Sequence, residues 1–232
     1  MKAGFISLGC AKNQVDTEIM IALLKRSGYK IVSKVERADI VVINTCGFID
    51  PAKEEAVDNI IATGKLKAAG QLRYLVATGC LAQRYGQELL DEMPELDGVI
   101  GISHFVQIDM IMDRIVAGER VLEVSEPPQV FIEKGPRVLT TPPGSAYLKI
   151  TEGCNNRCTY CAIPSIRGRL RSKPRQEVIQ EASELVKRGV RELVVVGQDT
   201  ALYGVDRVGK SELPDLLRDL GGVEGLEWIR LM

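Results

Sequence analysis

The sequence predicts an α/β protein in which an N-terminal domain with a parallel sheet precedes the first part of a (β/α) partial barrel. Short apolar runs alternate with helical patterns along the 232 residues, as is typical of βαβ units. A segment at 126–144 with five prolines in nineteen residues separates two such series. The second series, 145–232, holds only about three βα units, whereas a complete barrel takes about 250 residues.

The first domain is expected to cover 1–125. Its predicted strands are short runs rich in Ile, Val and Leu, at 3–8, 29–32, 40–43, 73–77 and 99–100. Its predicted helices lie at 16–26, 51–68, 87–93 and 106–116. Ile19, Leu23 and Leu24 recur at helical spacing in the first helix, Ser27-Gly28 ends it, and Pro51 opens the second.

The segment 126–144 reads as an extended connector that could lie against either domain. Beyond it we expect strands at 146–150, 192–196 and 227–231 and helices at 176–187 and 213–220, with Pro174 marking the start of the first helix. Because the barrel is incomplete, we expect a fragment that lacks later strands and is inactive by itself.

Composition places the chain among ordinary globular proteins. Apolar residues make up 45% and charged residues 26%, and the net charge of −1 gives no global attraction to nucleic acid or membrane. We find no secretory signal and no run of about 18 apolar residues. The chain reads as cytoplasmic, without a membrane partner, and in that compartment clustered cysteines more often indicate metal than disulfides.

Three of the six cysteines lie within eight residues, in the pattern C-x3-C-x2-C formed by Cys154, Cys158 and Cys161. Thiolates hold iron-sulfur clusters, and three of them leave one iron of a 4Fe-4S cluster without a protein ligand. A structural zinc site is the main alternative, but it needs four ligands, and the only histidine, His104, is fifty residues upstream. A thiol-rich loop without metal is the other alternative.

The remaining cysteines, Cys10, Cys46 and Cys80, each follow a predicted apolar strand. The ends of parallel strands share one sheet edge, where ligands of open α/β sheets bind. Neighbouring strands are about 4.8 Å apart, so these cysteines could meet at a second cluster. Each could equally be a small buried core residue.

The cysteine loop resembles the signature of the radical S-adenosylmethionine (SAM) enzymes. The resemblance implies that SAM binds the open iron, that Tyr160 packs near its adenine, and that Ala162 and Ile163 flank the adenine. It implies Gln198 as a contact for the amino-acid or ribose end of SAM. It also implies Asp199, Tyr203 and Arg167 as candidate substrate contacts. The position of Gln198 and Asp199 agrees with this, because polar groups that follow a barrel strand usually face the site.

Arg167, Arg169, Arg171, Lys173 and Arg175 place five basic residues in nine. They are either a solvated surface or a contact for ribosomal RNA or an acidic substrate. The pattern leaves both open.

Three further motifs resemble the methylthiotransferases, a branch of the radical SAM enzymes: Gly9 to Asn13, Asn44 to Glu54 and Gly79 to Gln83. The resemblance covers essentially the whole chain and implies two 4Fe-4S clusters, with an auxiliary one on Cys10, Cys46 and Cys80 that carries the sulfur to be inserted. One SAM would methylate that sulfur, and a second would yield the radical that abstracts hydrogen from the substrate. A flavodoxin or ferredoxin is the implied electron donor.

Several stretches look like the methylthiotransferase branch that modifies an aspartate β-carbon in a small-subunit ribosomal protein: Ser7 to Asn13, Cys46 to Asp50, Pro164 to Gly168, and Gln198 to Gly204. The alternative branch modifies tRNA adenosines and usually has glutamine and methionine in place of Ala11 and Lys12. A non-catalytic iron-sulfur carrier is a further alternative.

Overall fold

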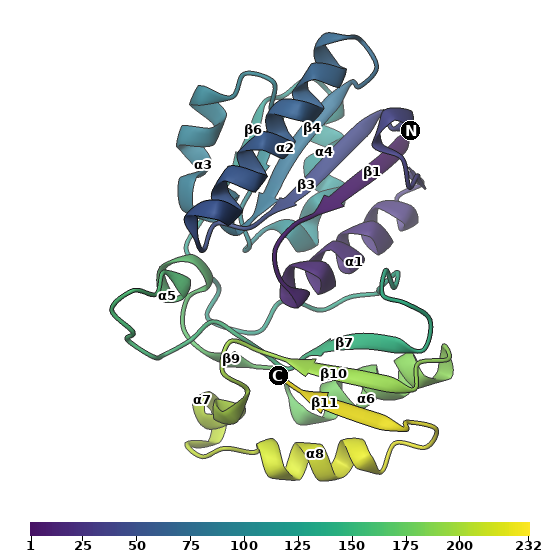
Figure 1. Cartoon of the computed structure of the whole chain (residues 1–232), viewed down its shortest axis with the longest axis vertical. Helices are drawn as coiled ribbons and strands as arrows, with labels where there is room; N and C mark the ends of the chain where they lie inside the picture. Colours follow the sequence, from purple (N-terminus) through teal and green to yellow (C-terminus); the bar gives the residue numbers. More distant parts are fainter. The chain divides into compact units, whose positions relative to one another are not determined.

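The computed structural model describes residues 1–232 and contains two compact units (Figure 1). The first consists of Met1–Pro127 and Ile132–Val138, and the second of Pro128–Phe131 and Leu139–Met232. The proline-rich segment therefore contributes residues to both. Each unit has its own parallel sheet, which confirms the predicted α/β fold class.

The first unit is built on six parallel strands in the order β2-β1-β3-β4-β5-β6. Their bounds are β1 Lys2–Ser7, β2 Lys30–Ile31, β3 Ile40–Thr45, β4 Tyr74–Gly79, β5 Gly98–Ile100 and β6 Val121–Glu123. Because β1 has β2 on one side and β3 on the other, the strand order reverses at β1. The β1/β3 boundary is the topological switch point, where open sheets of this type form their binding crevice.

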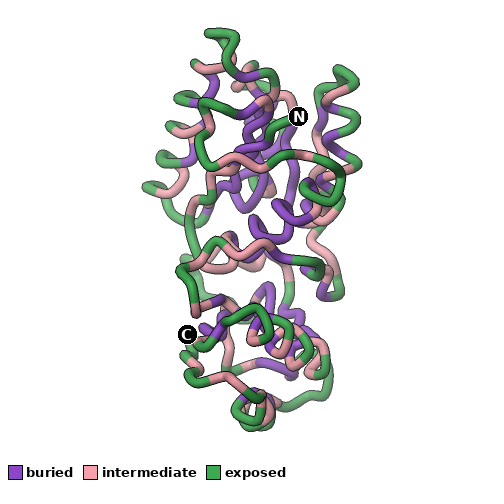
Figure 2. The backbone as a smooth tube through the Cα atoms, turned by 90° about the vertical axis from the view of Figure 1, so that its right-hand side faces the viewer, coloured by how far each residue is buried: buried purple, intermediate pink, exposed green.

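Helices cover both faces of this sheet. Helices α2 (Asp50–Ala68) and α3 (Cys80–Glu92) pack one face of β3 and β4 into an apolar core. Helix α1 (Ala11–Arg26), the short η2 (Phe105–Gln107) and α4 (Ile108–Val116) contact one another, and η1 (Val35–Arg37) lies beside β1. Strand β3 is buried at every residue, as expected for a continuous apolar strand covered on both faces. Figure 2 shows the buried stretches of the chain in purple.

Two helices begin earlier than predicted. Helix α1 begins at Ala11 rather than Asp16, and its first turns bury the polar Asn13, so the apolar pattern starts late. Helix α3 begins at Cys80 rather than Gln87, and a non-helical Tyr85 (φ −130°) interrupts its periodicity. Strand β6 was not predicted.

The second unit has the strand order β11-β10-β7, all parallel, with bounds β7 Ser145–Lys149, β10 Glu192–Val196 and β11 Trp228–Leu231. Consecutive strands are neighbours, as in a (β/α) barrel. Helices α6 (Arg175–Lys187) and α8 (Leu213–Gly221) bury this sheet. The strand predicted at 192–196 is confirmed, and Pro174 immediately precedes α6 as expected.

A short antiparallel pair that was not predicted, β8 (Thr151–Glu152) with β9 (Arg171–Ser172), follows β7. It closes the base of the loop at 153–170, which contains the three clustered cysteines and α5 (Ile163–Arg167). Two further short helices, η3 (Thr200–Leu202) and α7 (Val205–Val208), follow β10.

The proline-rich segment forms no helix or strand, but its residues are anchored. In the first unit Arg137 donates from Nε and Nη2 to the buried carboxylate of Glu18, at 3.0 and 2.6 Å. In the second unit Phe131 lies 6.0 Å from the ammonium of Lys173. No helix of the chain is both long enough and apolar enough to cross a membrane.

Candidate functional site

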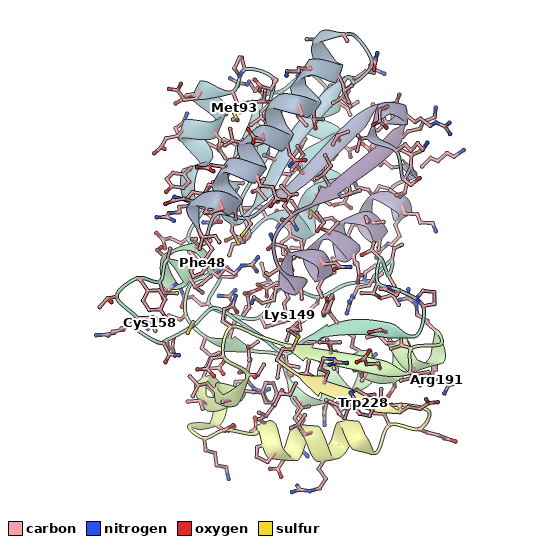
Figure 3. The ribbon with its side chains drawn as sticks, in the orientation of Figure 1. Phe48, Met93, Lys149, Cys158, Arg191 and Trp228 are labelled. Carbon is pink, nitrogen blue, oxygen red and sulfur yellow. The ribbon has the colours of Figure 1, made fainter.

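The loop between β8 and α5 brings Cys154, Cys158 and Cys161 to one cavity of about 560 Å³. Figure 3 labels Cys158 on this loop. Cys158 is exposed and the other two are partly exposed, so all three thiols are accessible from the cavity. The other lining residues are Asn155, Asn156, Arg157, Pro164 and Arg169.

Hydrogen bonds hold the cysteine-bearing part of this loop, and Ile166 and Leu170 are buried near its other end. The backbone N–H of Cys154 donates to the carbonyl of Gly168 at 3.1 Å, and the N–H of Leu170 donates to Oδ1 of Asn155 at 3.0 Å. The N–H of Asn156 points at Sγ of Cys154, 3.4 Å away. Backbone donors of this kind stabilise cluster-bound thiolates and tune their potential.

Gly153 starts the loop in a conformation that only glycine adopts without strain, with φ of +71°. A Cβ at this position would lie 2.1 Å from the carbonyl oxygen of Arg169. The two ends of the loop therefore pass each other at backbone contact.

A buried carboxylate lies directly below the loop. Glu152 accepts hydrogen bonds from Lys149 Nζ at 3.0 Å and from Arg167 Nη1 at 2.5 Å. Its other oxygen accepts from Gln198 Nε2 at 2.8 Å and from the N–H of Gly153 at 3.2 Å. Glu152 thus joins β7, α5 and the end of β10 to the first residue of the cysteine loop.

Gln198 and Asp199 follow β10, as expected, but the structure gives them clear local partners. Asn156 donates from Nδ2 to Oδ2 of Asp199 at 2.9 Å, so Asp199 holds the cysteine loop. Gln198 uses its amide N–H on Glu152, and its Oε1 is buried without a hydrogen-bond partner. That acceptor suits a donor such as an amino group.

The predicted substrate contacts Arg167 and Tyr203 have partners inside the fold. Both side chains are buried in the second unit, Arg167 against Glu152 and Tyr203 through a hydrogen bond from its hydroxyl to the carbonyl of Lys173 at 2.8 Å. Burial raises the pKa of Tyr203 to about 12. A role of either residue in substrate contact therefore stays a prediction, and what the structure gives them is a place in the buried interior of the second unit.

The run of five basic residues is not one solvated surface. Arg171 and Lys173 are buried beside Arg167, and Lys173 pairs with Glu181 while Arg175 pairs with Asp219. Only Arg169 of the five lines the cysteine cavity. By contrast, Tyr160 is 84% exposed, and Ala162 and Ile163 form the start of α5, at the loop as the pattern predicts.

The second set of cysteines follows three adjacent strands. Cys10 precedes α1 after β1, Cys46 follows β3, and Cys80 begins α3 directly after β4. Because β1, β3 and β4 are neighbours, the three positions share one sheet edge at the switch point. Two of them are at helix N-termini, where the helix dipole favours a thiolate.

The chain segments that carry these cysteines are in close contact. A Cβ at Gly9 would lie 2.7 Å from Cβ of Cys46, and one at Gly47 would lie 2.8 Å from the backbone of Leu81. A Cβ at Gly79 would lie 2.3 Å from Oδ1 of Asn44. Glycine at these three positions lets three loops meet at one place, which suits a group shared by all three thiols.

Both cysteine sets offer three thiolates and an open position, a donor set that fits an iron-sulfur cluster. The structure contains no group of three or more His, Cys, Asp or Glu side chains already arranged to hold a metal ion. Ligation by either set therefore stays a prediction.

Sequence reasoning missed Asn13, Glu152 and Asn156, which hold the cysteine loops. Each stands within three residues of a cysteine. A polar residue close in sequence to a candidate ligand cysteine was the signal that could have identified these residues as supports of the loops.

Comparison with known families matches both units. Residues 2–101 match the family described as "Uncharacterized protein family UPF0004", and residues 148–227 match the radical SAM superfamily.

Curated relatives match along the whole chain. The chain is 60% identical over 232 residues to "Ribosomal protein uS12 methylthiotransferase RimO" of Syntrophomonas wolfei, covering 100% of this chain and 53% of the relative. It is 51% identical over 229 residues to the protein of the same name from Thermoanaerobacter sp., covering 99% and 52%. The chain thus spans about half the length of the curated relatives it matches.

Solved structures share the fold at low identity. The radical SAM methyltransferase TsrM from Kitasatospora setae, with tryptophan and a SAM analogue bound, has a TM-score of 0.61 at 13% identity over 94% of this chain and 50% of TsrM. The cobalamin-dependent SAM radical enzyme OxsB has a TM-score of 0.58 at 12% identity over 99% of this chain and 38% of OxsB. These solved structures show the fold alone. By its curated relatives and the two family models, the chain is similar along its whole length to the radical SAM methylthiotransferases, and within them to the uS12 branch.

Proposed function

We propose that this chain carries both iron-sulfur centres of a methylthiotransferase that adds a methylthio group to the β-carbon of an aspartate in ribosomal protein uS12. One observation carries the proposal. Two separate sets of three cysteines each occupy the binding edge of a parallel sheet, in a chain matched along its whole length by relatives named for that reaction.

The proposed division of labour follows the two units. Residues 1–125 hold an auxiliary 4Fe-4S cluster on Cys10, Cys46 and Cys80, 126–144 form the linker, and 145–232 are the first part of the radical SAM barrel. There Cys154, Cys158 and Cys161 hold the second cluster. Together the bound clusters and SAM would supply the carbon-centred radical and the methylthio group.

The chain's own residues bind and orient these groups. The unpartnered Oε1 of Gln198 is available to accept from the amino group of SAM, and exposed Tyr160 is available to stack on its adenine. Asp199 orients the cysteine loop through Asn156. None of these roles needs an acid-base histidine, which suits a chain with one histidine. The protein would work in the cytoplasm with a flavodoxin or ferredoxin as electron donor.

Iron and sulfide counts after anaerobic reconstitution test the two centres. The comparison uses the chain and two triple variants, Cys154→Ala/Cys158→Ala/Cys161→Ala and Cys10→Ala/Cys46→Ala/Cys80→Ala. We expect about eight irons in the chain and about four in each variant. If the chain holds about four irons and the first variant none, the strand-end cysteines are core residues and the proposal fails. Bound zinc without iron would also reject it.

The substrate is tested with a chimera, because the chain covers about half of each relative. The chain is joined to the remaining part of the Syntrophomonas wolfei relative and expressed in bacteria that lack their own uS12 methylthiotransferase. Mass spectrometry should find uS12 heavier by one CH2S unit on an aspartate. A methylthio group on tRNA adenosine instead would assign the chain to the other branch, and neither modification would contradict the proposed activity.

A further inference from the structure

Asn13 lies in the first turn of α1, three residues after Cys10, and is completely buried. Its Nδ2 donates to the carbonyl of Leu8 at 3.1 Å and to the carbonyl of Thr45 at 2.9 Å. These carbonyls belong to the residues at the ends of β1 and β3, next to Gly9-Cys10 and Cys46. One amide therefore bonds the chain just before two of the three strand-end cysteines.

The third cysteine reaches the same side chain. Sγ of Cys80 donates to Oδ1 of Asn13 at 3.8 Å, a distance compatible with a weak sulfur hydrogen bond. The orientation of the amide is determined by these partners, because Nδ2 faces two carbonyl oxygens and Oδ1 faces a thiol. The side chain of Asn13 is thus bonded to the chain at all three strand ends.

Asn13 is itself held from below. Asn44 donates from Nδ2 to the carbonyl of Asn13 at 2.8 Å and to Oγ1 of Thr17 at 3.0 Å. Thr17 in turn donates to the carbonyl of Asn13 at 3.0 Å and contacts Oγ of Ser7 at 2.9 Å. This buried polar layer belongs to the helix and strands, and it holds the backbone of α1 at Asn13.

We propose that Asn13 is a positioning residue for the auxiliary cluster: it holds the ends of β1, β3 and β4 at the separation that lets Cys10, Cys46 and Cys80 bind one cluster. The inference rests on the proposed function. Its physical basis is that the three loops meet through glycines in close contact, so their spacing depends on directional contacts at the strand ends. Thr45 supplies one such contact between β3 and β4, from its Oγ1 to the carbonyl of Thr78 at 2.5 Å. The buried amide of Asn13, with two donors and one acceptor, supplies the contacts that reach all three strand ends.

The test replaces Asn13 by Asp and by Ala and measures iron, sulfide and the electron paramagnetic resonance of the reduced protein. Asn13→Asp has nearly the same shape but places a carboxyl group against two carbonyl oxygens, so it should fail as Ala does. We expect both variants to lose about half of their iron, from about eight to about four. The lost signal should be the one that also disappears in the Cys10/Cys46/Cys80 variant, and the signal that changes on addition of SAM should remain.

Two controls separate positioning from general loss of stability. Thr17→Val removes the bonds of Thr17 to Ser7 and Asn44 but none of those that the Asn13 amide makes to Leu8, Thr45 and Cys80. It should keep both clusters even where its melting temperature falls as far as that of Asn13→Ala. Asn59→Ala, on α2, removes a hydrogen bond to the carbonyl of Glu55 in its own helix and should change neither cluster.

The inference is overturned if both Asn13 variants reconstitute about eight irons. It is also overturned if Thr17→Val loses the auxiliary cluster at the melting temperature of Asn13→Ala. The third refuting result is that the Asn13 variants show no cooperative unfolding, because Asn13 would then serve folding alone. Failure of the proposed function looks different. In that case the unsubstituted chain itself binds only about four irons.

Discussion

Replacement of Glu152 by glutamine tests whether the radical SAM cysteine loop rests on a buried ionic network. The carboxylate is completely buried, and its two cationic partners, Lys149 and Arg167, are each exposed by only 2%. Glutamine preserves the shape of the side chain and one acceptor oxygen. What it removes is the charge that compensates these two cations.

Removal of one partner of a buried ion pair costs roughly 3–5 kcal/mol, because the remaining charge is neither paired nor solvated. Lys149 and Arg167 each have further interactions, so we expect the lower end, about 3 kcal/mol. A loss of this size makes exchange through unfolding of the second unit roughly 150-fold faster. Because that unit has only roughly 100 residues, the same loss lowers its melting temperature by roughly 12–24 °C.

Hydrogen-exchange mass spectrometry resolves this effect by unit. Peptides from β7 and β10 should exchange faster in Glu152→Gln, and peptides from β3 and β4 should not change, because the first unit has its own core. Glu184→Gln, at an exposed position of α6, is the matched control and should stay within about 0.5 kcal/mol of the unsubstituted chain. Exchange in β7 and β10 that is no faster in Glu152→Gln than in Glu184→Gln would refute the reasoning.

Three further predictions follow from the structure. Gly153→Ala should halve the bound iron, because its Cβ would lie 2.1 Å from a carbonyl oxygen. Its control is Gly70→Ala, which has a matching φ of +72° but open space around the Cβ. That control should keep its full iron content and lower the free energy of unfolding in urea by only about 1–2 kcal/mol. Tyr160→Ala should change the free energy of unfolding by less than about 0.5 kcal/mol because the ring is 84% exposed, yet it should weaken SAM binding in calorimetry; equal affinity would remove Tyr160 from the cofactor site. Burial raises the pKa of Tyr203 from 10.0 to about 12. The free energy of unfolding should therefore be constant in this respect below pH 10 and should fall as the pH rises to about 12, because the unfolded chain ionises first. In unfolding measured against pH, Tyr203→Phe should abolish this fall.

The sequence predicts most strands well and the beginnings of α1 and α3 poorly. Strand β3 is an unbroken apolar run buried on both faces, so its pattern is unambiguous. Helix α1 buries Asn13, Asp16 and Thr17, and a polar residue in the core counts against a helix in any apolar pattern. Tyr85 has the same effect in α3, because its non-helical backbone shifts the apolar residues that follow it.

The candidate site shows the same limit. Spacing alone placed Cys154, Cys158 and Cys161 together, and strand alternation alone placed Cys10, Cys46 and Cys80 at one sheet edge. Spacing could not tell that Arg167 and Tyr203 are buried, since a residue just after a strand can turn into the core as well as into the site. That distinction depends on partners far away in sequence, such as Glu152 for Arg167.

Both cysteine sets are supported in a similar way, although one is a compact loop and the other comes from three separate strands. Topology decides where each set lies, because parallel strands end at a common edge. The geometry of each set depends on a buried polar side chain beneath it, Asn13 in the first unit and Glu152 in the second. Buried side chains such as Leu81 and Ile166 anchor these segments in the cores, and directional hydrogen bonds from the rigid sheet edge add the orientation that packing alone does not fix. It follows that substitutions which leave every cysteine in place, at either of these two residues, should still disrupt the corresponding cysteine set.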